Sequence, residues 1–247
     1  MSLNPLTPVA DYQSMLTRIF WFTSAAALLA ICMLRSSIEG LDTFLSAIDG
    51  TLKIDREKSL LVPVGSLAPA LLVGLASRVF RIHSNIANWL GIRERFDLDV
   101  ILRALARGTQ TDYHQFSEAT LLKHRYDLMK RCFYQYVNGR RPQIDELLIE
   151  RALDMWSWFW VGIETTVVFV ATSFIYIACG QLSSGMTLFG TTLAFATLGL
   201  PAIRDECRRY ALAQVREILA EPERAEQVRE AFAKLIPATE DTYRRAA

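Results

Sequence analysis

Four stretches with almost no charged side chains constrain this chain more than any other feature. They run from Leu16 to Leu34, from Ser59 to Phe80, from Trp156 to Cys179 and from Ser184 to Ile203. A helix rises about 1.5 Å per residue, so each stretch is long enough to cross a hydrocarbon core of roughly 30 Å. The sequence therefore predicts an all-α protein with four transmembrane helices.

The few charges in these stretches occupy telling positions. Arg18 and Arg78 stand near stretch ends, where we expect their side chains to snorkel toward water. Aromatic residues at the same level predict a belt at the membrane interface. Its members are Phe20, Trp21, Phe22, Trp156, Trp158 and Trp160. Pairs of small residues predict close helix contacts. They are Ala26 with Ala30, Ala70 with Gly74, and Gly190 with Ala194.

The distribution of basic residues predicts the orientation. Thirteen of the 27 Lys and Arg lie between Arg78 and Arg151, nine lie from Arg204 to Arg245, and the turn 180–185 has none. The positive-inside rule then predicts that the large loop and both termini lie in the cytoplasm. The predicted organisation is residues 1–80 with two spans, 81–155 as a helical cytoplasmic domain, 156–203 with two spans, and 204–247 as an amphipathic tail.

The cytoplasmic loop has helical periodicity throughout, with no strand-like alternation. We expect the second span to continue to Ile92, and Asp97 to cap a helix that ends near Gly108. Ser117 is expected to cap a longer helix that ends at Asn138 and Gly139. A further helix is expected to start near Pro142, a residue suited to a first helical turn, and to run into the third span without a break.

The tail after Pro201 is expected to form two amphipathic helices. Cys207 and Ile218 lie on the packing face of the first, and Val228 and Phe232 on that of the second. Together with the loop, these helices are long enough for a small domain that is marginal in one copy.

Known catalytic patterns are missing from the sequence. It contains no GxxxxGK phosphate loop, no HExxH and no GxSxG, and its three histidines show no metal-ligand spacing. The four cysteines also lack ligand spacing, although Cys32 and Cys179 stand near the outward ends of their spans, where a disulfide is an open alternative. We therefore predict a protein that is not an enzyme and that has no catalytic residues, cofactor or metal.

Glu164 is the most informative single residue, because a carboxyl group inside a span is costly unless it faces protein or water. One hypothesis makes Glu164, with Thr165 and Thr191, part of an ion path. The alternative is a structural glutamate that is hydrogen-bonded between helices. Four spans alone rarely enclose a water-filled passage, so an ion path requires a homo-oligomer.

A second candidate site lies on the predicted helix after Ser117, where cations alternate with aromatic rings. That combination suits a phosphate-bearing ligand with stackable bases, such as a nucleotide signal. The alternative is a basic face that rests near anionic lipid headgroups. No duplex nucleic acid is expected as a partner. The predicted ligand-binding residues are Lys123, Arg125, Tyr126, Lys130, Arg131 and Tyr134.

The overall plan, four short spans and a helical cytoplasmic domain without catalytic motifs, resembles the small four-transmembrane effector proteins of bacterial anti-phage defence systems. The resemblance is one of architecture over the whole chain. It implies an oligomeric ion channel or pore that its cytoplasmic domain holds closed, and that a nucleotide signal or a partner protein opens. The rival hypothesis is a non-conducting anchor or assembly subunit that docks a cytoplasmic partner. A small transporter is a third hypothesis.

Overall fold

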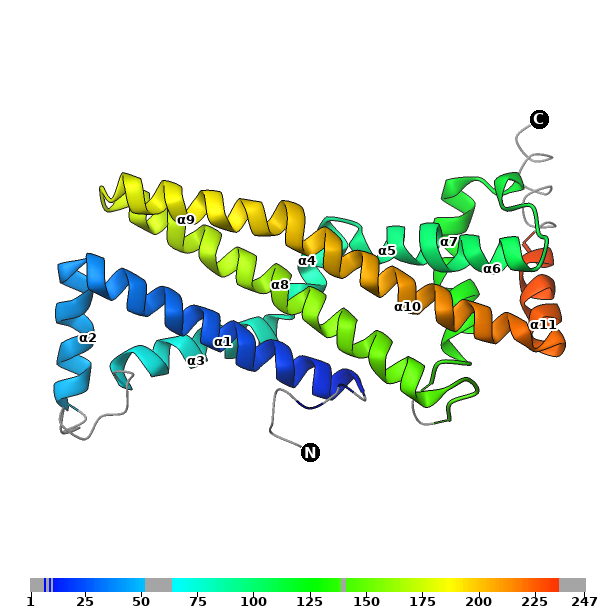
Figure 1. Ribbon diagram of the computed structural model, residues 1–247, viewed down its shortest axis with the longest axis horizontal. Coiled ribbons are helices and arrows are strands. Elements are labelled where there is room, and N and C mark those ends of the chain that lie inside the picture. Colours follow the sequence, from blue (N-terminus) through cyan, green and yellow to red (C-terminus); the bar gives the residue numbers. More distant parts are fainter. Residues whose placement is uncertain (1–6, 8, 10, 52–63, 139–140, 236–247) are drawn as a thin grey trace. The chain divides into compact units, whose positions relative to one another are not determined.

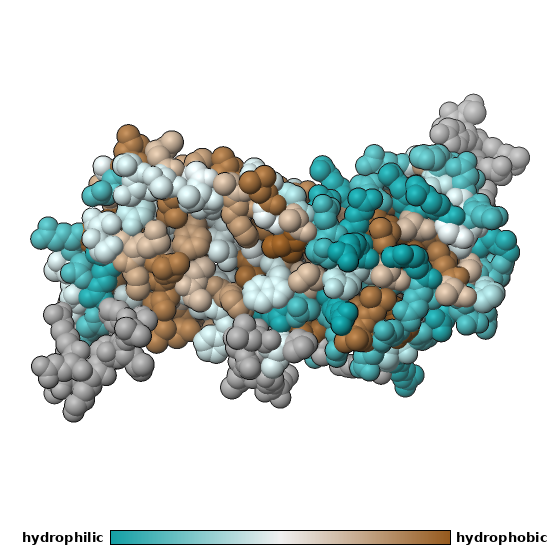
Figure 2. Space-filling model, viewed as in Figure 1, coloured by the Kyte–Doolittle hydropathy of each residue, from teal (hydrophilic) through white to brown (hydrophobic). Residues whose placement is uncertain are grey.

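The computed structural model of the protein describes residues 7, 9, 11–51, 64–138 and 141–235, and all regular elements in these ranges are helices. The chain divides into two compact units. We call residues 1–84 and 155–204 the apolar unit, and residues 85–154 and 205–247 the polar unit. Figure 2 shows hydrophobic residues gathered over the first and hydrophilic residues over the second.

Helix α1, Tyr12–Ser37, begins at a capping box. The Asp11 carboxylate accepts a hydrogen bond from the Ser14 amide (2.7 Å), and the Ser14 hydroxyl oxygen accepts one from the Asp11 amide (3.0 Å). Two otherwise unpaired donors at the helix start are thereby satisfied. This local motif fixes where the first long apolar helix begins.

A short amphipathic helix, α2 (Glu39–Thr51), follows α1 directly, where the sequence predicted only a connection. Arg35 near the end of α1 explains why this segment is ordered. Its guanidinium donates to Asp42 (2.6 Å), Ser46 (2.8 Å) and Asp49 (3.1 Å), all on α2. The Arg35 guanidinium thus binds two carboxylates of α2 and holds α2 against α1.

Helix α3, Val64–Phe80, packs closely along α1 (Figure 1). Gly74 makes this approach feasible, because a Cβ built there would lie 2.0 Å from the Ser24 hydroxyl oxygen and 2.9 Å from the Phe20 carbonyl oxygen. The predicted small-residue contact of Ala70 and Gly74 is confirmed, with Ala70 only 1% exposed. The start of the second predicted span, residues 59–63, lies outside the described residues.

The second span does not continue straight to Ile92, so that prediction was wrong. Arg81 adopts a positive φ of 49°, and α4 (Ile82–Trp89) starts at a bend of 54° from α3. A non-glycine residue in the left-handed region interrupts the helix, a feature that hydropathy alone does not reveal. The bend directs α4 away from the line of α3.

Helix α8, Glu146–Ala178, runs without a break from the polar unit into the apolar unit, as predicted. It starts four residues later than expected, where the Asp145 carboxylate accepts a hydrogen bond from the Leu147 amide. Gly180, with a φ of 81°, turns the chain into α9 (Leu182–Ala194), which lies beside α8 (Figure 1). A Cβ on Gly185 would meet Ile177 at 2.6 Å.

After α9, a π-helical segment, η4 (Phe195–Gly199), leads directly into α10 (Leu200–Ala220). The sequence predicted that a new helix starts after Pro201. Instead, α10 continues directly from η4 and contains Pro201 in its first turn. Among the described residues, three helices are long and apolar enough to cross a membrane: Tyr12–Ser37, Glu146–Ala178 and the continuous Leu182–Ala220. The bent pair Gly65–Phe80 and Ile82–Trp89 makes a fourth if it is one span.

The polar unit is built from short helices around one core. They are α5 (Ile92–Phe96), η1 (Asp97–Leu102), α6 (Arg103–Gly108), η2 (Tyr113–Gln115), α7 (Glu118–Met129), η3 (Lys130–Tyr134) and α11 (Pro222–Ala233). Val228 and Phe232 of α11 are fully buried, which confirms the predicted packing face. The Tyr136 hydroxyl donates to Gln227 (2.8 Å) and so joins the loop to the tail.

Two capping predictions for this unit had different outcomes. Ser117 does cap α7, because its hydroxyl oxygen accepts a hydrogen bond from the Thr120 amide (3.1 Å). Asp97 caps nothing: it lies inside a continuous helical stretch, in η1, and is buried. The predicted end of this helix at Gly139 lies outside the described residues.

All four cysteines are free thiols, so Cys32 and Cys179 do not form a disulfide.

Candidate functional site

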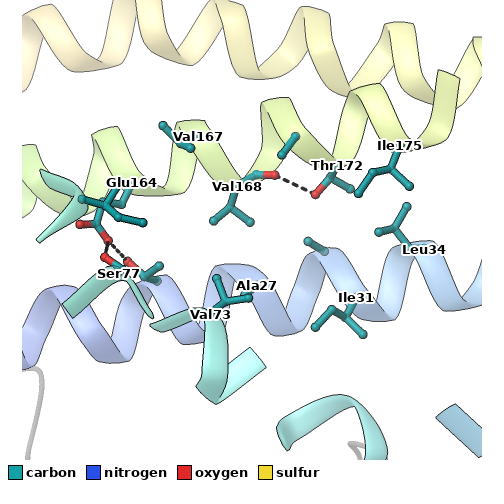
Figure 3. A pocket seen from close by; sticks show the side chains of 14 residues that line it. Ala27, Ile31, Leu34, Val73, Ser77, Glu164, Val167, Val168, Thr172 and Ile175 are labelled. Atoms are coloured by element: carbon teal, nitrogen blue, oxygen red, sulfur yellow. Dashed lines mark hydrogen bonds between the residues drawn. The ribbon is translucent and has the colours of Figure 1, made fainter. Parts of the chain in front are cut away.

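Glu164 on α8 lies at the centre of a buried polar cluster in the apolar unit. Its side chain is 2% exposed, and its Oε2 accepts hydrogen bonds from Thr23 Oγ1 of α1 (2.6 Å) and Ser77 Oγ of α3 (2.5 Å). Figure 3 shows Glu164 and Ser77 pointing toward each other across the helices. Hydroxyl donors from two other helices thus converge on one carboxylate oxygen.

His83, the second residue of α4, completes this cluster. Its Nδ1 lies 3.5 Å from Glu164 Oε1, and its Nε2 lies 3.5 Å from the hydroxyl oxygen of Tyr12. His83 is fully buried, whereas Tyr12 at the start of α1 is 46% exposed. The bend at Arg81 turns α4 so that this imidazole lies between the buried carboxylate and an exposed phenol. We call Tyr12, Thr23, Ser77, His83 and Glu164 the Glu164 cluster.

The Glu164 cluster combines an acid and a base, which are groups able to exchange a proton. A carboxylate and a neighbouring imidazole share a proton readily, and the two ring nitrogens of His83 are directed to different partners. The distances of 3.5 Å are longer than a full hydrogen bond, so a small side-chain rotation or one bridging water completes the chain from Tyr12 to Glu164. Neither Arg nor Lys is among these partners.

Arg18 of α1 is buried rather than snorkelling, so that expectation was wrong. It is 2% exposed, and its guanidinium donates to Ser157 Oγ of α8 (2.8 Å) and to the Thr7 carbonyl oxygen (2.7 Å). It also lies 4.9 Å from the ring centre of Trp158, a cation–π contact. These partners satisfy the Arg18 guanidinium inside the fold, so its side chain does not extend to water.

The predicted aromatic belt holds only in part, because Trp160 is fully buried. Its ring centre lies 6.1 Å from that of His83, so it packs inside the apolar unit. Trp21, by contrast, is 38% exposed, in keeping with an interfacial position. The spacing of the three tryptophans on α8 did not reveal that one of them faces inward.

The predicted ion-path threonines are not part of the Glu164 cluster. Thr191 is exposed on α9 and donates to the Thr187 carbonyl oxygen of its own helix (3.1 Å). Thr165 is half-buried on α8, next to Glu164 in sequence. Hydroxyl groups inside helices commonly bond back to the preceding turn in this way, which satisfies them locally. The cluster instead recruits Thr23 and Ser77 from the first two apolar helices.

The basic helix of the polar unit presents most of its predicted ligand residues to the surface. Lys123, Tyr126, Lys130, Arg131 and Tyr134 are exposed on α7 and η3. Their role in binding an anion stays a prediction.

Arg125 differs from these neighbours because it is already engaged. It donates to Asp97 (2.6 Å) and lies 3.8 Å from Glu94. Burial raises the pKa of Asp97 to about 6, although Arg125 pulls the pKa down. The guanidinium of Arg125 thus already has carboxylate partners within its own unit, and its role in binding an anion also stays a prediction.

Sequence reasoning missed His83, Thr23, Ser77 and Asp97. No fixed spacing links the first three to Glu164, because they come from three different helices. A usable signal was that Thr23 and Ser77 are hydroxyl residues in predicted spans and so had the chance to meet the one acid there. Among the described residues, no group of three or more His, Cys, Asp or Glu is placed to hold a metal ion.

No curated protein and no solved structure matches the chain. A family model, described as the YmfE protein family, matches residues 11–234. That range contains all the residues of the Glu164 cluster and nearly all of both units. The chain therefore belongs to the YmfE protein family.

Proposed function

We propose that the protein is an oligomeric ion channel or pore of the bacterial inner membrane, with Glu164 as its ion site and its polar unit as the gate. The observation that carries this proposal is the chain of groups from exposed Tyr12 through buried His83 to Glu164. These groups provide a route by which a proton or a small cation reaches the carboxylate from one side.

Electrostatics favours a functional role for Glu164. Placing an acid at the centre of a membrane helix costs about 2.5–3.5 kcal/mol on insertion scales, so such residues are rare unless they serve a purpose. Its nearest groups are two hydroxyls and an imidazole, none of which carries a permanent positive charge. A proton or a cation supplies the missing charge, and exchange of that ion is the basis of conduction.

The oligomer part of the proposal rests on α9. Gly190 has no atom within 4 Å of where a Cβ would lie, so the small-residue face with Ala194 is open to a neighbour. Large apolar side chains on the same helix, including Leu182 at 61% and Met186 at 55% exposed, are also uncovered. In a bilayer, small residues allow the helices of a second copy to approach closely.

The orientation and the gating follow from charge. Basic residues are concentrated in the polar unit, and by the positive-inside rule this supports a cytoplasmic position for that unit and both termini. There, exposed Lys123, Lys130 and Arg131 offer a binding surface for a nucleotide signal or an acidic partner. The architectural resemblance to anti-phage effectors suggests defence as the biological setting.

The rival function is a non-conducting membrane anchor or assembly subunit. One observation favours it: Thr23 and Ser77 belong to different helices, so Glu164 also joins α1, α3 and α8. In that account the cluster only stabilises the helix packing. The two functions differ in whether His83 and Tyr12 matter for transport.

Ion flux in liposomes that contain the full chain tests the proposal, with the oligomer size measured in detergent. We expect wild-type protein to release a proton or K⁺ gradient, and His83→Gln to slow that release at least about tenfold, equivalent to about 1.4 kcal/mol on the barrier. Tyr12→Phe, which removes only the outer hydroxyl, should slow proton release by a smaller factor.

Tyr176→Phe is the matched control, because the Tyr176 hydroxyl contacts Ser37 (3.4 Å) and lies outside the Glu164 cluster. It should conduct like wild type. Absence of flux from well-folded wild-type protein, or full flux from His83→Gln, would favour the anchor.

A further inference from the structure

A cavity of about 300 Å³ lies beside the Glu164 cluster, within the apolar unit. Residues of α1, α3, α4 and α8 line it, and Figure 3 shows it between α1 and α8. Glu164 and Ser77 stand at one end, and Leu34 and Ile175 at the other. Thr23, which is hydrogen-bonded to Glu164, lines the same end as Glu164. Ile175 follows Glu164 by eleven positions on α8, which is a distance of about 16 Å along the helix, so the cavity is long and narrow.

The wall is apolar except at the Glu164 end. The one polar residue beyond that end is Thr172, whose hydroxyl donates to the Val168 carbonyl oxygen of its own helix (2.8 Å). Alanines such as Ala27 and Ala30 leave the room that larger side chains would fill. A space of this kind favours a hydrocarbon chain, because each buried CH₂ group contributes about 0.8 kcal/mol.

The polar end favours a cationic head. Glu164 is the one charged residue of the lining, and its Oε1 has no hydrogen-bond donor nearer than His83 at 3.5 Å. That oxygen therefore keeps the capacity to accept a hydrogen bond. The hydroxyl oxygens of Thr23 and Ser77 donate to Oε2, which leaves their lone pairs available to a donor.

The cavity is also accessible from the surface of the unit. Val73, Val167 and Ile175 line it and are still 41%, 46% and 44% exposed. In a membrane that surface meets lipid tails, so a molecule with an apolar body can enter sideways from the bilayer. A fully water-soluble cation has no polar wall to follow on this side.

We propose that this cavity binds an amphiphilic monocation with a linear apolar chain, of the alkylammonium class, with the cationic head at Glu164 and the chain along α8 toward Leu34. The inference takes the membrane placement and the role of Glu164 from the proposed function, and adds the class of ligand. The cationic head of such a ligand gives Glu164 a positively charged partner, which its protein contacts do not provide.

Calorimetric binding to the full chain in zwitterionic detergent tests this with three probes of one chain length: decylammonium, decanol and decanoate. Decylammonium should bind at least about tenfold more tightly than either other probe, which corresponds to about 1.4 kcal/mol. Glu164→Gln should reduce the affinity for decylammonium to that for decanol, and Glu164→Asp should keep the preference for the cation even if the glutamine variant folds poorly.

A second pair of variants tests the place of binding. Ala171→Phe puts a large ring into the cavity about two helical turns from Glu164 and should remove saturable binding of decylammonium, while Val170→Phe on the same helix, outside the lining, should not. Equal binding of decanol and decylammonium to wild type would overturn the proposal in favour of a lipid tail. Absence of saturable binding would overturn it outright. The assay needs no conduction, so its failure is distinct from a failure of ion flux.

Discussion

Among the residues that the structure describes, each unit buries one carboxylate, and the two carboxylates have different surroundings. In the polar unit, Asp97 is 5% exposed and its carboxylate contacts the guanidinium of Arg125 at 2.6 Å. In the apolar unit, Glu164 is 2% exposed and contacts two hydroxyls and an imidazole. A permanent cation balances the first charge, whereas none of the groups that contact the second carries a permanent positive charge.

This difference separates two kinds of buried acid. A buried carboxylate with a fixed guanidinium partner has a counter-charge beside it whenever it is ionised, and removal of that partner is costly. A buried carboxylate that contacts only hydroxyl groups and an imidazole has no permanent counter-charge beside it. Both residues are hidden from solvent, so burial alone does not distinguish them.

Removal of Arg125 should have the largest effect on stability. Arg125→Met leaves Asp97 buried without its cation, and we expect the polar unit to lose about 3–5 kcal/mol of unfolding free energy. Hydrogen exchange of the amides in α5, η1 and α7 measures this loss. Lys123→Met, on the exposed face of the same helix, should change the stability by less than about 0.5 kcal/mol. Equal protection in the two variants would mean that the ion pair does not hold the unit together.

Through Asp97, the free energy of unfolding should depend on pH in a defined direction. Its folded pKa of about 6 lies above the ordinary aspartate value of 3.8, so between these pH values the folded state binds more protons than the unfolded state. The unfolding free energy therefore falls as pH rises from about 4 to 6, by on the order of 2–3 kcal/mol.

Thermal unfolding of wild type and Asp97→Asn over this pH range checks that effect. The asparagine variant lacks the titration, so the difference between the two proteins should shift with pH in favour of wild type at acid pH. The cost of Arg125→Met should also shrink at low pH, where Asp97 is protonated. A pH-independent difference would show that Asp97 is not the titrating group.

The close contact between α1 and α3 should be sensitive to one methyl group added at Gly74. Gly74→Ala forces a Cβ against Ser24 and the Phe20 carbonyl oxygen, so α1 and α3 must separate at a cost of about 1–3 kcal/mol. Thermal unfolding in detergent measures it. Gly40→Ala on α2, where nothing lies within 4 Å of the added Cβ, is the control and should not lower the midpoint. A tolerated Gly74→Ala would place the main α1–α3 contact elsewhere.

The smallest effect on stability is expected for the double change of Lys130 and Arg131 to Glu, since both side chains are exposed. It should cost less than about 0.5 kcal/mol, yet abolish the response to a phosphate-bearing trigger if these residues bind one. Liposome flux with and without added nucleotides reports both. A fully responsive variant would reject the ligand site while leaving the comparison of the two acids intact.

Much of the fold was predictable, because hydropathy and capping are local properties. The charge-free windows located the apolar helices, and Ser117 marked the start of α7 through its own hydroxyl. The helix α2 was missed because its order depends on Arg35 reaching two carboxylates, a contact outside any sequence window. The bend at Arg81 likewise depends on a left-handed residue that no Gly or Pro announces.

The candidate site was predictable only at its centre. Glu164 stood out as an acid inside an apolar stretch, but its partners were not Thr165 or Thr191. Thr23, Ser77 and His83 join it from α1, α3 and α4, and the choice among many hydroxyl residues is made by helix packing. In the same way, Arg125 looked like a free cation until the fold brought Asp97 beside it.

The most direct test of the central claim compares the two acids in one assay. Glu164→Gln and Asp97→Asn each remove one buried charge and keep size and hydrogen bonding, so ion flux through liposomes, normalised to the amount of folded oligomer, separates their roles. We predict that Glu164→Gln lowers flux at least about tenfold, equivalent to about 1.4 kcal/mol, with its oligomer intact, and that Asp97→Asn conducts like wild type. Wild-type flux through the Glu164→Gln variant would contradict the account.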